Sequence, residues 1–163
     1  MIIREASFID KPEVINLLIR SQLATGVPDP IVFPSQELGA RLYAREAVKR
    51  YVATGADRIV GHAMIEKPNE DNIAKWRSAL RHDMNDLLEM GGDFVDPNFS
   101  KQGIWTDLLR HRLRVIRHIG AIPVTATWSF NDHVKKVYLS HGAVAAGTQN
   151  TKNGDVDLFV FPN

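Results

Sequence analysis

The amino-acid sequence predicts an α/β domain built on a mixed sheet, with helices on both faces. Three observations support this fold class. The chain has 163 residues, which is enough for one domain with a substantial core. Short apolar runs bounded by turn residues alternate with stretches of helical periodicity. Regular strand–helix alternation is confined to the second half of the chain, so both parallel and antiparallel strand pairing are expected.

The first half of the chain begins with a short strand at residues 1–5. Asp10 is predicted to cap the helix that follows, because Glu13 completes a capping-box pattern and Pro12 lies in the first turn. This helix should end near Gly26. A second helix is expected from Ser35, and a β-hairpin at residues 48–54 and 58–66 has its turn at 55–57.

The second half begins with a third helix at residues 68–82, where apolar residues recur at three- and four-residue spacing. A central strand at 87–95 leads into a long helix at 103–118, and Gly91-Gly92 inside that strand indicates a bulge. The remaining elements are a strand at 122–128, a short helix capped by Asn131, and strands at 144–149 and 156–161.

Composition limits the class of function. The chain is 44% hydrophobic and 24% charged with a net charge of +1, so neither nucleic acid nor an anionic membrane is an expected partner. No apolar run has the length of a membrane span, and the first residues lack the pattern of a signal peptide. There is no cysteine, and the six histidines show no shared metal-ligand spacing, so we expect no metal and a cytoplasmic location.

The most informative segment joins the central strand to the long helix. An apolar strand ends at Val95, a polar turn with one glycine follows, and the helix begins at about Gly103. The first N–H groups of a helix have no partner inside it, and the helix dipole favours negative charge there. The segment therefore predicts a site for a phosphate or diphosphate.

Two motifs then resemble those of the GNAT family of N-acetyltransferases. Gly103-Ile104 followed by Leu108-Leu109 is similar to the family's pyrophosphate loop and the helix after it. Asn131, Tyr138 and Gly142 are similar to its second motif, and one helix and one strand separate the two. The resemblance implies a mixed, mostly antiparallel sheet of six to seven strands with a splayed central pair. It also implies a single domain over residues 1–163, with a helical insert at about 68–83.

The sequence departs from the family pattern at three positions. Ser100 stands where the family has Arg or Gln, Trp105 where it has Gly or Ala, and Ala143 where it has Phe. A bulky indole beside the phosphates would crowd them, whereas an indole turned into the core would not. These departures leave room for a non-catalytic acyl-CoA-binding or regulatory domain as the alternative function.

The resemblance implies an acetyl-CoA-dependent N-acetyltransferase that acts on a primary amine of a small molecule or peptide by direct attack on the thioester. Acetyl-CoA is the expected cosubstrate. The expected contacts come from the central strand, the loop and the start of the long helix, and the second motif: Phe94, Val95, Ser100, Lys101, Gln102, Gly103, Ile104, Trp105, Thr106 and Asn131. The alternative for the loop is an ordinary helix N-terminus with a solvated lysine, and for Asn131 a simple cap.

Two residues are the candidates for proton transfer. Glu89 lies on the central strand where some family members carry a catalytic glutamate, and a buried carboxylate is costly unless it is paired or functional. A salt bridge to an arginine is the alternative, and Asp93 is the weaker candidate for the base. Tyr138 is the candidate acid for the departing thiolate, and packing of the helix on the sheet is its alternative role.

The acceptor is expected near Asp29, Phe33 and Trp128, which with Glu89 form an acidic and partly aromatic group suited to a small cationic amine. The apolar stripe of the insert at 68–83 must pack on its own core, on a substrate or on a second copy in a homodimer. Its apolar face could instead serve a plain protein-interaction domain. The basic run at 110–118 is interpreted as a solvated helix face rather than a contact for nucleic acid or the 3′-phosphate of CoA.

Overall fold

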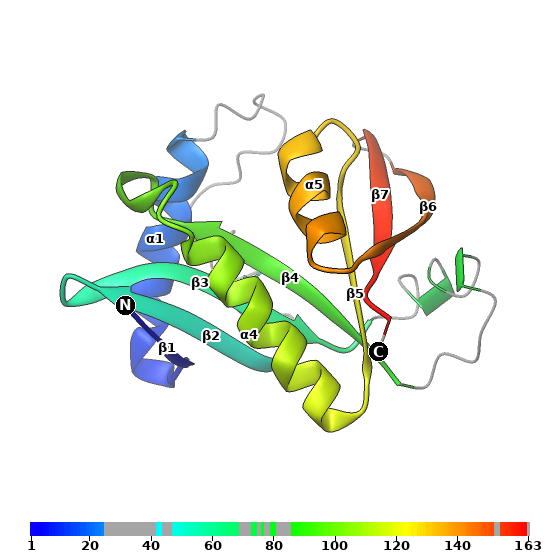
Figure 1. The fold of residues 1–163 in the computed structure, drawn as a ribbon. Helices are drawn as coiled ribbons and strands as arrows, with labels where there is room; N and C mark the ends of the chain where they lie inside the picture. Colours follow the sequence, from blue (N-terminus) through cyan, green and yellow to red (C-terminus); the bar gives the residue numbers. More distant parts are fainter. Residues whose placement is uncertain are drawn as a thin grey trace. The chain divides into compact units, whose positions relative to one another are not determined.

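The computed structural model describes residues 1–24, 42–43, 47–68, 73–74, 76, 79–80, 86–151 and 154–162. Its elements are, in chain order, β1 (Ile2–Glu5), η1 (Phe8–Asp10), α1 (Lys11–Ala24), β2 (Ala47–Gly55), β3 (Arg58–Glu66), β4 (Leu87–Val95), η3 (Pro97–Phe99), α4 (Ile104–Ile119), β5 (Ile122–Trp128), α5 (Asp132–Ser140), β6 (Val144–Thr151) and β7 (Gly154–Val160) (Figure 1). The central strand and the strand at 122–128 have the bounds that the sequence predicts. No helix within the described ranges is long and apolar enough to cross a membrane.

The strands form a seven-stranded sheet in the order β1-β2-β3-β4-β5-β7-β6. Pairing is antiparallel between β1 and β2, β2 and β3, β5 and β7, and β6 and β7, and parallel between β4 and β5. The predicted mixed, mostly antiparallel sheet is therefore confirmed. Strands β4 and β5 pair over Leu87–Glu89 and Ile122–Val124. Both strands are fully described and form no further register pair beyond these residues. This agrees with the central pair of splayed strands that the resemblance implies.

The chain divides into two compact units. The first contains Met1–Glu66 and Gly92–Arg112, and the second contains Lys67–Gly91 and Leu113–Asn163. Both β4 and α4 run from one unit into the other. The expectation of a single domain over the whole chain stays a prediction, and each unit is described below by itself.

In the first unit, helices cover both faces of the strands. Val52 belongs to a buried cluster with Val14 and Leu17 of α1. The preceding residue, Tyr51, packs its ring edge against His111 of α4, with ring centroids 4.6 Å apart. Successive strand residues point to opposite faces, so α1 and the first part of α4 lie on opposite sides of β2 and β3 (Figure 1).

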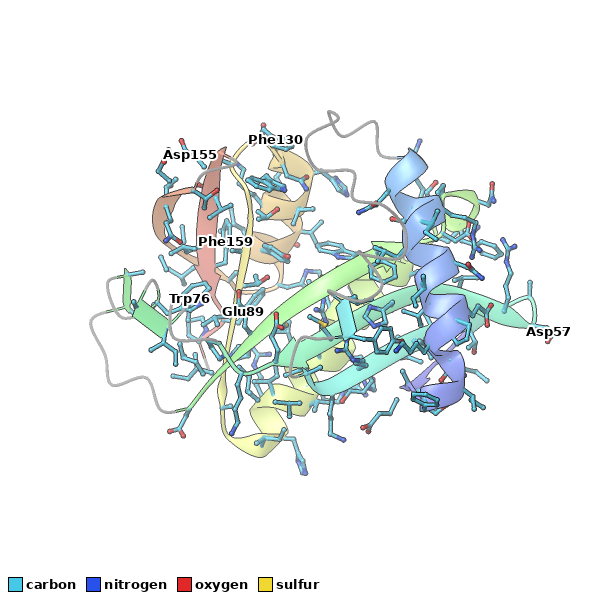
Figure 2. All side chains as sticks on the ribbon, turned by 180° about the vertical axis from the view of Figure 1, so that it is seen from behind. Asp57, Trp76, Glu89, Phe130, Asp155 and Phe159 are labelled. Carbon is cyan, nitrogen blue, oxygen red and sulfur yellow. The ribbon has the colours of Figure 1, made fainter. Side chains whose placement is uncertain are left out.

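The hairpin between β2 and β3 closes at the predicted turn, with Asp57 at its tip (Figure 2). Ala56 and Asp57 have φ values of 51° and 58°. Two successive left-handed residues form the turn that matches the twist of a two-residue hairpin. That turn favours Asn-Gly, so its backbone conformation is costly for Ala56.

The start of the first helix differs from the prediction. Ser7, rather than Asp10, is the N-cap, and it precedes the short η1 that runs directly into α1. Asp10 completes this capping box, because its Oδ2 accepts hydrogen bonds from the N–H and Oγ of Ser7. Arg4 also donates to both carboxylate oxygens of Asp10 at 2.7 Å and holds its pKa well below the usual range. Both Ser and Asp are strong capping residues, so the sequence pattern allowed either residue to be the N-cap.

In the second unit, residues on β5 and β7 alternate between two packed faces. Val124 and Leu158 pack with Leu87 and the fully buried Trp76 of the predicted insert. The adjacent Phe159 instead contacts the ring of Tyr138 on α5. The described residues of the insert, 73–74, 76 and 79–80, are helical, and Trp76 packs on the core of its own unit. The homodimer contact that the insert could make stays a prediction.

Candidate functional site

The loop between β4 and α4 has the backbone shape that the sequence predicts for an anion site. Lys101 and Gly103 have φ values of 62° and 79°, so the chain turns sharply before the helix. Asp107 donates its N–H to the carbonyl of Gly103 at 2.9 Å. The N–H groups ahead of it, on Gln102, Gly103, Ile104 and Thr106, make no hydrogen bond within the described part of the chain.

These features fit a diphosphate. Alternation of right- and left-handed residues directs successive N–H groups into one concavity, and the helix dipole adds positive potential. A Cβ atom built on Gly103 would meet nothing within 4 Å, so a ligand can approach the backbone there. Lys101 and Ser100 are exposed, while Ile104 is buried and fixes the start of α4 in the core. The loop therefore offers backbone donors and one cationic side chain.

Asp96 anchors this loop, and the sequence interpretation missed it. Its carboxylate is fully buried and accepts from the backbone N–H of Asn98 at 3.0 Å. The guanidinium groups of Arg20 and Arg58 each donate to Oδ2 at 3.2 Å. The sequence signal was Asp96-Pro97, an N-cap residue followed by proline at the first helical position. The two arginines come from α1 and β3, so the loop is tied to both elements.

The end of β4 is supported by a buried histidine. The Nδ1–H of His62 donates to the carbonyl of Gly92 at 2.8 Å, and its ring stacks on Phe94 with centroids 4.6 Å apart. Burial lowers the pKa of His62 to about 4, so the ring is neutral at neutral pH. Gly92 has φ of 63°, and a Cβ atom there would lie 2.9 Å from the sulfur of Met64. The backbone of β4 therefore has a left-handed residue at the glycine pair, where the sequence predicts a bulge.

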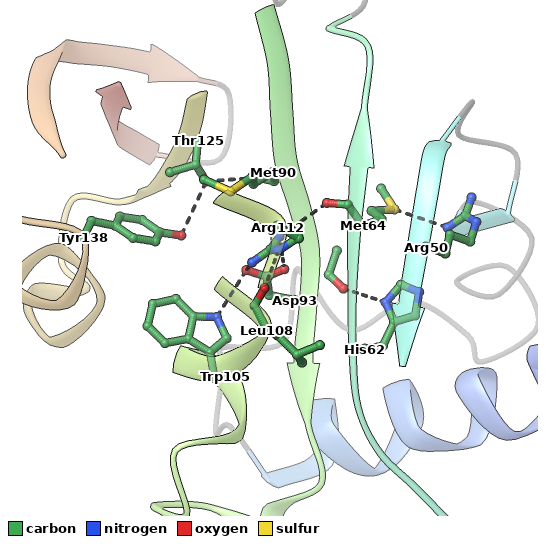
Figure 3. A network of polar contacts seen from close by, with 11 residues as sticks. Arg50, His62, Met64, Met90, Asp93, Trp105, Leu108, Arg112, Thr125 and Tyr138 are labelled. Carbon is green, nitrogen blue, oxygen red and sulfur yellow. Dashed lines mark hydrogen bonds and ion pairs between the residues drawn. The ribbon is translucent and has the colours of Figure 1, made fainter. Parts of the chain in front are cut away.

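Trp105 does not turn its indole nitrogen toward the phosphate loop. Its Nε1–H donates to Oδ2 of Asp93 at 3.1 Å (Figure 3). Nη2 of Arg112 donates to the same Oδ2 at 2.7 Å, and Nη1 forms an ion pair with Oδ1 at 2.6 Å. The solvated basic face expected at 110–118 is therefore wrong for Arg112, which is fully buried. Asp93 carries this ion pair, which disfavours it as a catalytic base.

Tyr138 is buried on α5 and packs against aromatic residues of β7 and the chain end. Its ring lies 5.4 Å from that of Phe159 and 5.8 Å from that of Phe161. The packing role expected for it is present, while its hydroxyl oxygen lies 3.4 Å from Oγ1 of Thr125. Thr125 donates to the carbonyl of Met90 on β4 at 2.9 Å. Tyr138, Thr125 and Met90 all belong to the second unit, so these polar contacts hold the phenol within that unit.

Glu89 is buried in the stretch of β4 that pairs with β5, opposite Val124. Alternation along the strand places Glu89 on the same face as Leu87, which packs with Val124 and Trp76. Thr125 and Tyr138 lie on the other face. The candidate base and the candidate acid therefore project from opposite sides of the sheet within this unit.

The other predicted site residues are placed as follows. The side chain of Asn131 caps α5 by accepting from the N–H of Val134 at 3.4 Å, so the capping role is present. Trp128 ends β5 and its ring is parallel to that of Phe130, with centroids 6.1 Å apart. Asp29 and Phe33 lie outside the described residues. Among the side chains that the structure describes, no group of three or more His, Cys, Asp or Glu could hold a metal ion.

Comparison with known proteins shows similarity in structure but not in sequence. No family model and no curated protein sequence matches this chain. A ribosomal-protein-alanine N-acetyltransferase from Brucella melitensis superposes with a TM-score of 0.71 at 17% identity, covering 98% of each chain. An acetyltransferase of the GNAT family from Streptococcus pneumoniae gives 0.70 at 20% identity, covering 98% of this chain and 96% of that one.

A third structure similar to this chain is from Salmonella typhimurium and is described as an acetyltransferase with its cofactor acetyl-CoA. It gives a TM-score of 0.71 at 17% identity and covers 98% of this chain and 92% of its own. Together these likenesses confirm, at the level of the fold, the resemblance that the two sequence motifs indicate. The chain has the fold of the GNAT N-acetyltransferases.

Proposed function

We propose that this chain is an acetyl-CoA-dependent N-acetyltransferase that acetylates a primary amine of a small molecule or peptide. One observation carries the proposal. In a chain with this fold, the turn and first helical residues after β4 leave the N–H groups of Gln102, Gly103, Ile104 and Thr106 without partners in the described chain. Such a row of donors at a helix N-terminus suits a diphosphate.

The residues that would hold the cosubstrate follow from this loop. The N–H groups of Gln102, Gly103, Ile104 and Thr106 would face the diphosphate, with Lys101 and the Ser100 hydroxyl beside it. Backbone groups of Phe94 and Val95 at the end of β4 would pair with the pantetheine arm. Asn131 already caps α5 through its side chain, so a contact with that arm would add to its capping role.

Acetyl-CoA supplies an activated thioester when it is bound, and the chain's own groups manage the protons. Glu89 accepts the proton that the amine loses as its nitrogen forms the new C–N bond, either directly or through a water. Tyr138 gives its phenolic proton to the sulfur as the C–S bond breaks. The acyl group would thus pass to the nitrogen in one direct attack, with the thiol of CoA as the leaving group.

The acceptor is proposed to be a small cationic amine. Trp128 offers an aromatic face, and Glu89 offers negative charge. Asp29 and Phe33 complete the proposed set from the loop between the first two predicted helices. A cation over an aromatic ring near a carboxylate is favourable, which supports an amine over an anionic acceptor.

Two measurements test the proposal. Titration of the purified protein with acetyl-CoA in a calorimeter tests binding, and a thiol-release assay with a panel of amines tests transfer. Saturable binding together with amine-dependent release supports the enzyme. Binding without release on any amine favours a non-catalytic acyl-CoA-binding domain, and absence of binding overturns both.

A further inference from the structure

The carboxylate of Asp93 receives two N–H donors and one further ion-pair contact, all from one helix. The guanidinium of Arg112 spans both of its oxygens, at 2.6 and 2.7 Å, and the indole N–H of Trp105 reaches Oδ2 at 3.1 Å. Arg112 also donates to the carbonyls of Met64 at 3.3 Å and Leu108 at 3.4 Å. Since the guanidinium has no exposed surface, it depends on Asp93 for charge neutralisation.

The positions of these residues along the chain indicate what the contacts of Asp93 do. Asp93 lies near the end of β4, just before the phosphate loop, and Trp105 is the second residue of α4, just after it. Arg112 follows Trp105 by about two helical turns and lies on the same helix face. The indole–carboxylate bond therefore joins the two ends of the loop, while the ion pair holds the next two turns of α4 to the same point on β4.

We propose that Asp93 and Trp105 are positioning residues that clamp the ends of the phosphate loop and so set the direction of the N–H groups at the start of α4. For its ligand, the diphosphate of acetyl-CoA, this inference rests on the proposed function. It also explains how tryptophan is tolerated where the family motif has glycine or alanine. A small residue would leave open space beside the phosphates. The indole of Trp105 is instead held in a fixed orientation by its hydrogen bond to Asp93.

The affinity test uses Trp105→Phe, which removes the N–H but keeps an aromatic ring, and Trp105→Ala, which restores a small residue of the family motif. Trp76→Phe is the matched control, because Trp76 is buried in the second unit and outside the loop. We expect both Trp105 variants to bind acetyl-CoA about fivefold more weakly, the equivalent of one net hydrogen bond, and the control to bind normally. Tighter binding by Trp105→Ala would mean that the indole obstructs the ligand, and unchanged binding would mean that the indole has no effect on it. Either result would overturn the inference.

Amide hydrogen exchange in the ligand-free protein separates this inference from the proposed function. In Trp105→Phe, the amides of Asp107 and Leu108 should exchange faster, while those of β6 and β7 keep their protection. If the wild-type protein does not bind acetyl-CoA, the proposed function fails and this exchange pattern alone decides the clamp. Unchanged exchange at Asp107, or an equal increase throughout the chain, would overturn it.

Discussion

The hydroxyl oxygen of Tyr138 lies 3.4 Å from Oγ1 of Thr125. Thr125 has one hydroxyl proton, and it is directed to the carbonyl of Met90 at 2.9 Å. In the contact with Tyr138, the threonine oxygen is therefore the acceptor and the phenol is the donor. This contact ties the phenol of Tyr138 to β5, and through Thr125 to the carbonyl of Met90 on β4.

Replacing Tyr138 with phenylalanine tests this acid. The ring packing against Phe159 and Phe161 is kept, so the fold should be preserved. We expect kcat to fall about 100-fold, the usual contribution of a positioned acid, with acetyl-CoA affinity changed less than about twofold. Steady-state kinetics and calorimetry measure the two quantities. Full activity across the pH range would remove Tyr138 from the proposed mechanism.

Replacing Glu89 with glutamine tests the base. The amide keeps the shape of a buried side chain but cannot take a proton from the amine. The rise of kcat/KM with pH should flatten, and the rate at neutral pH should fall by about 100-fold. A pH–rate profile of both proteins makes the comparison. An unchanged profile would indicate another base, or capture of the amine that is already neutral in solution.

Removing the carboxylate of Asp96 should loosen the phosphate loop. Asp96→Ala deletes the cap of η3 and leaves Arg20 and Arg58 without their shared acceptor, although both guanidinium groups are partly exposed and can be hydrated. The expected loss is about 2 kcal/mol in the free energy of unfolding, together with weaker acetyl-CoA binding. Urea denaturation measures the first effect.

A matched control for Asp96 is available on the surface. Asp155 is exposed and its side chain accepts from Asn150 at 2.8 Å, so Asp155→Ala should cost less than about 0.5 kcal/mol. Equal stability losses in the two variants would mean that neither the burial of Asp96 nor its contacts with the two arginines stabilise the loop.

Acid should destabilise the fold through His62. Its pKa is about 4 in the folded protein against 6.5 for an ordinary histidine, because burial disfavours the charged ring. The unfolded chain therefore binds a proton more readily than the folded one. Stability is complete above pH 6.5 and falls as the pH is lowered toward 4, by at most about 3 kcal/mol.

Chemical denaturation across this pH range checks the effect of His62. In His62→Gln, which offers an amide donor in place of the ring N–H, the slope between pH 6.5 and 4 should become shallower. An identical slope in both proteins would assign the acid sensitivity to carboxylates such as Asp10, whose pKa is lowered by its hydrogen bonds from Arg4.

Local signals were sufficient for most of the fold. The apolar runs fixed the bounds of β4 and β5, and Asn131 marked the start of α5, because propensity and capping act over a few neighbouring residues. The glycine pair in β4 marked the left-handed residue at Gly92 for the same reason. These features need no knowledge of distant contacts.

The contacts that shape the candidate site could not be predicted in this way. Arg112 stands in a basic run whose other members are more exposed, and only the tertiary structure shows that it meets Asp93, nineteen residues earlier. The same is true of Arg20 and Asp96, which are 76 residues apart. Charge pattern along one helix reports its average exposure but not the partner of a single buried group.

The turn at Ala56 and Asp57 offers a way to strengthen this protein without altering its candidate site. Both residues adopt left-handed backbone conformations without being glycine. Exchanging them for the Asn-Gly dipeptide would relieve that local strain, a gain on the order of 1 kcal/mol. Such a background would tolerate disruptive substitutions, Asp96→Ala among them, and would allow their effects on ligand binding to be measured in a protein that stays folded.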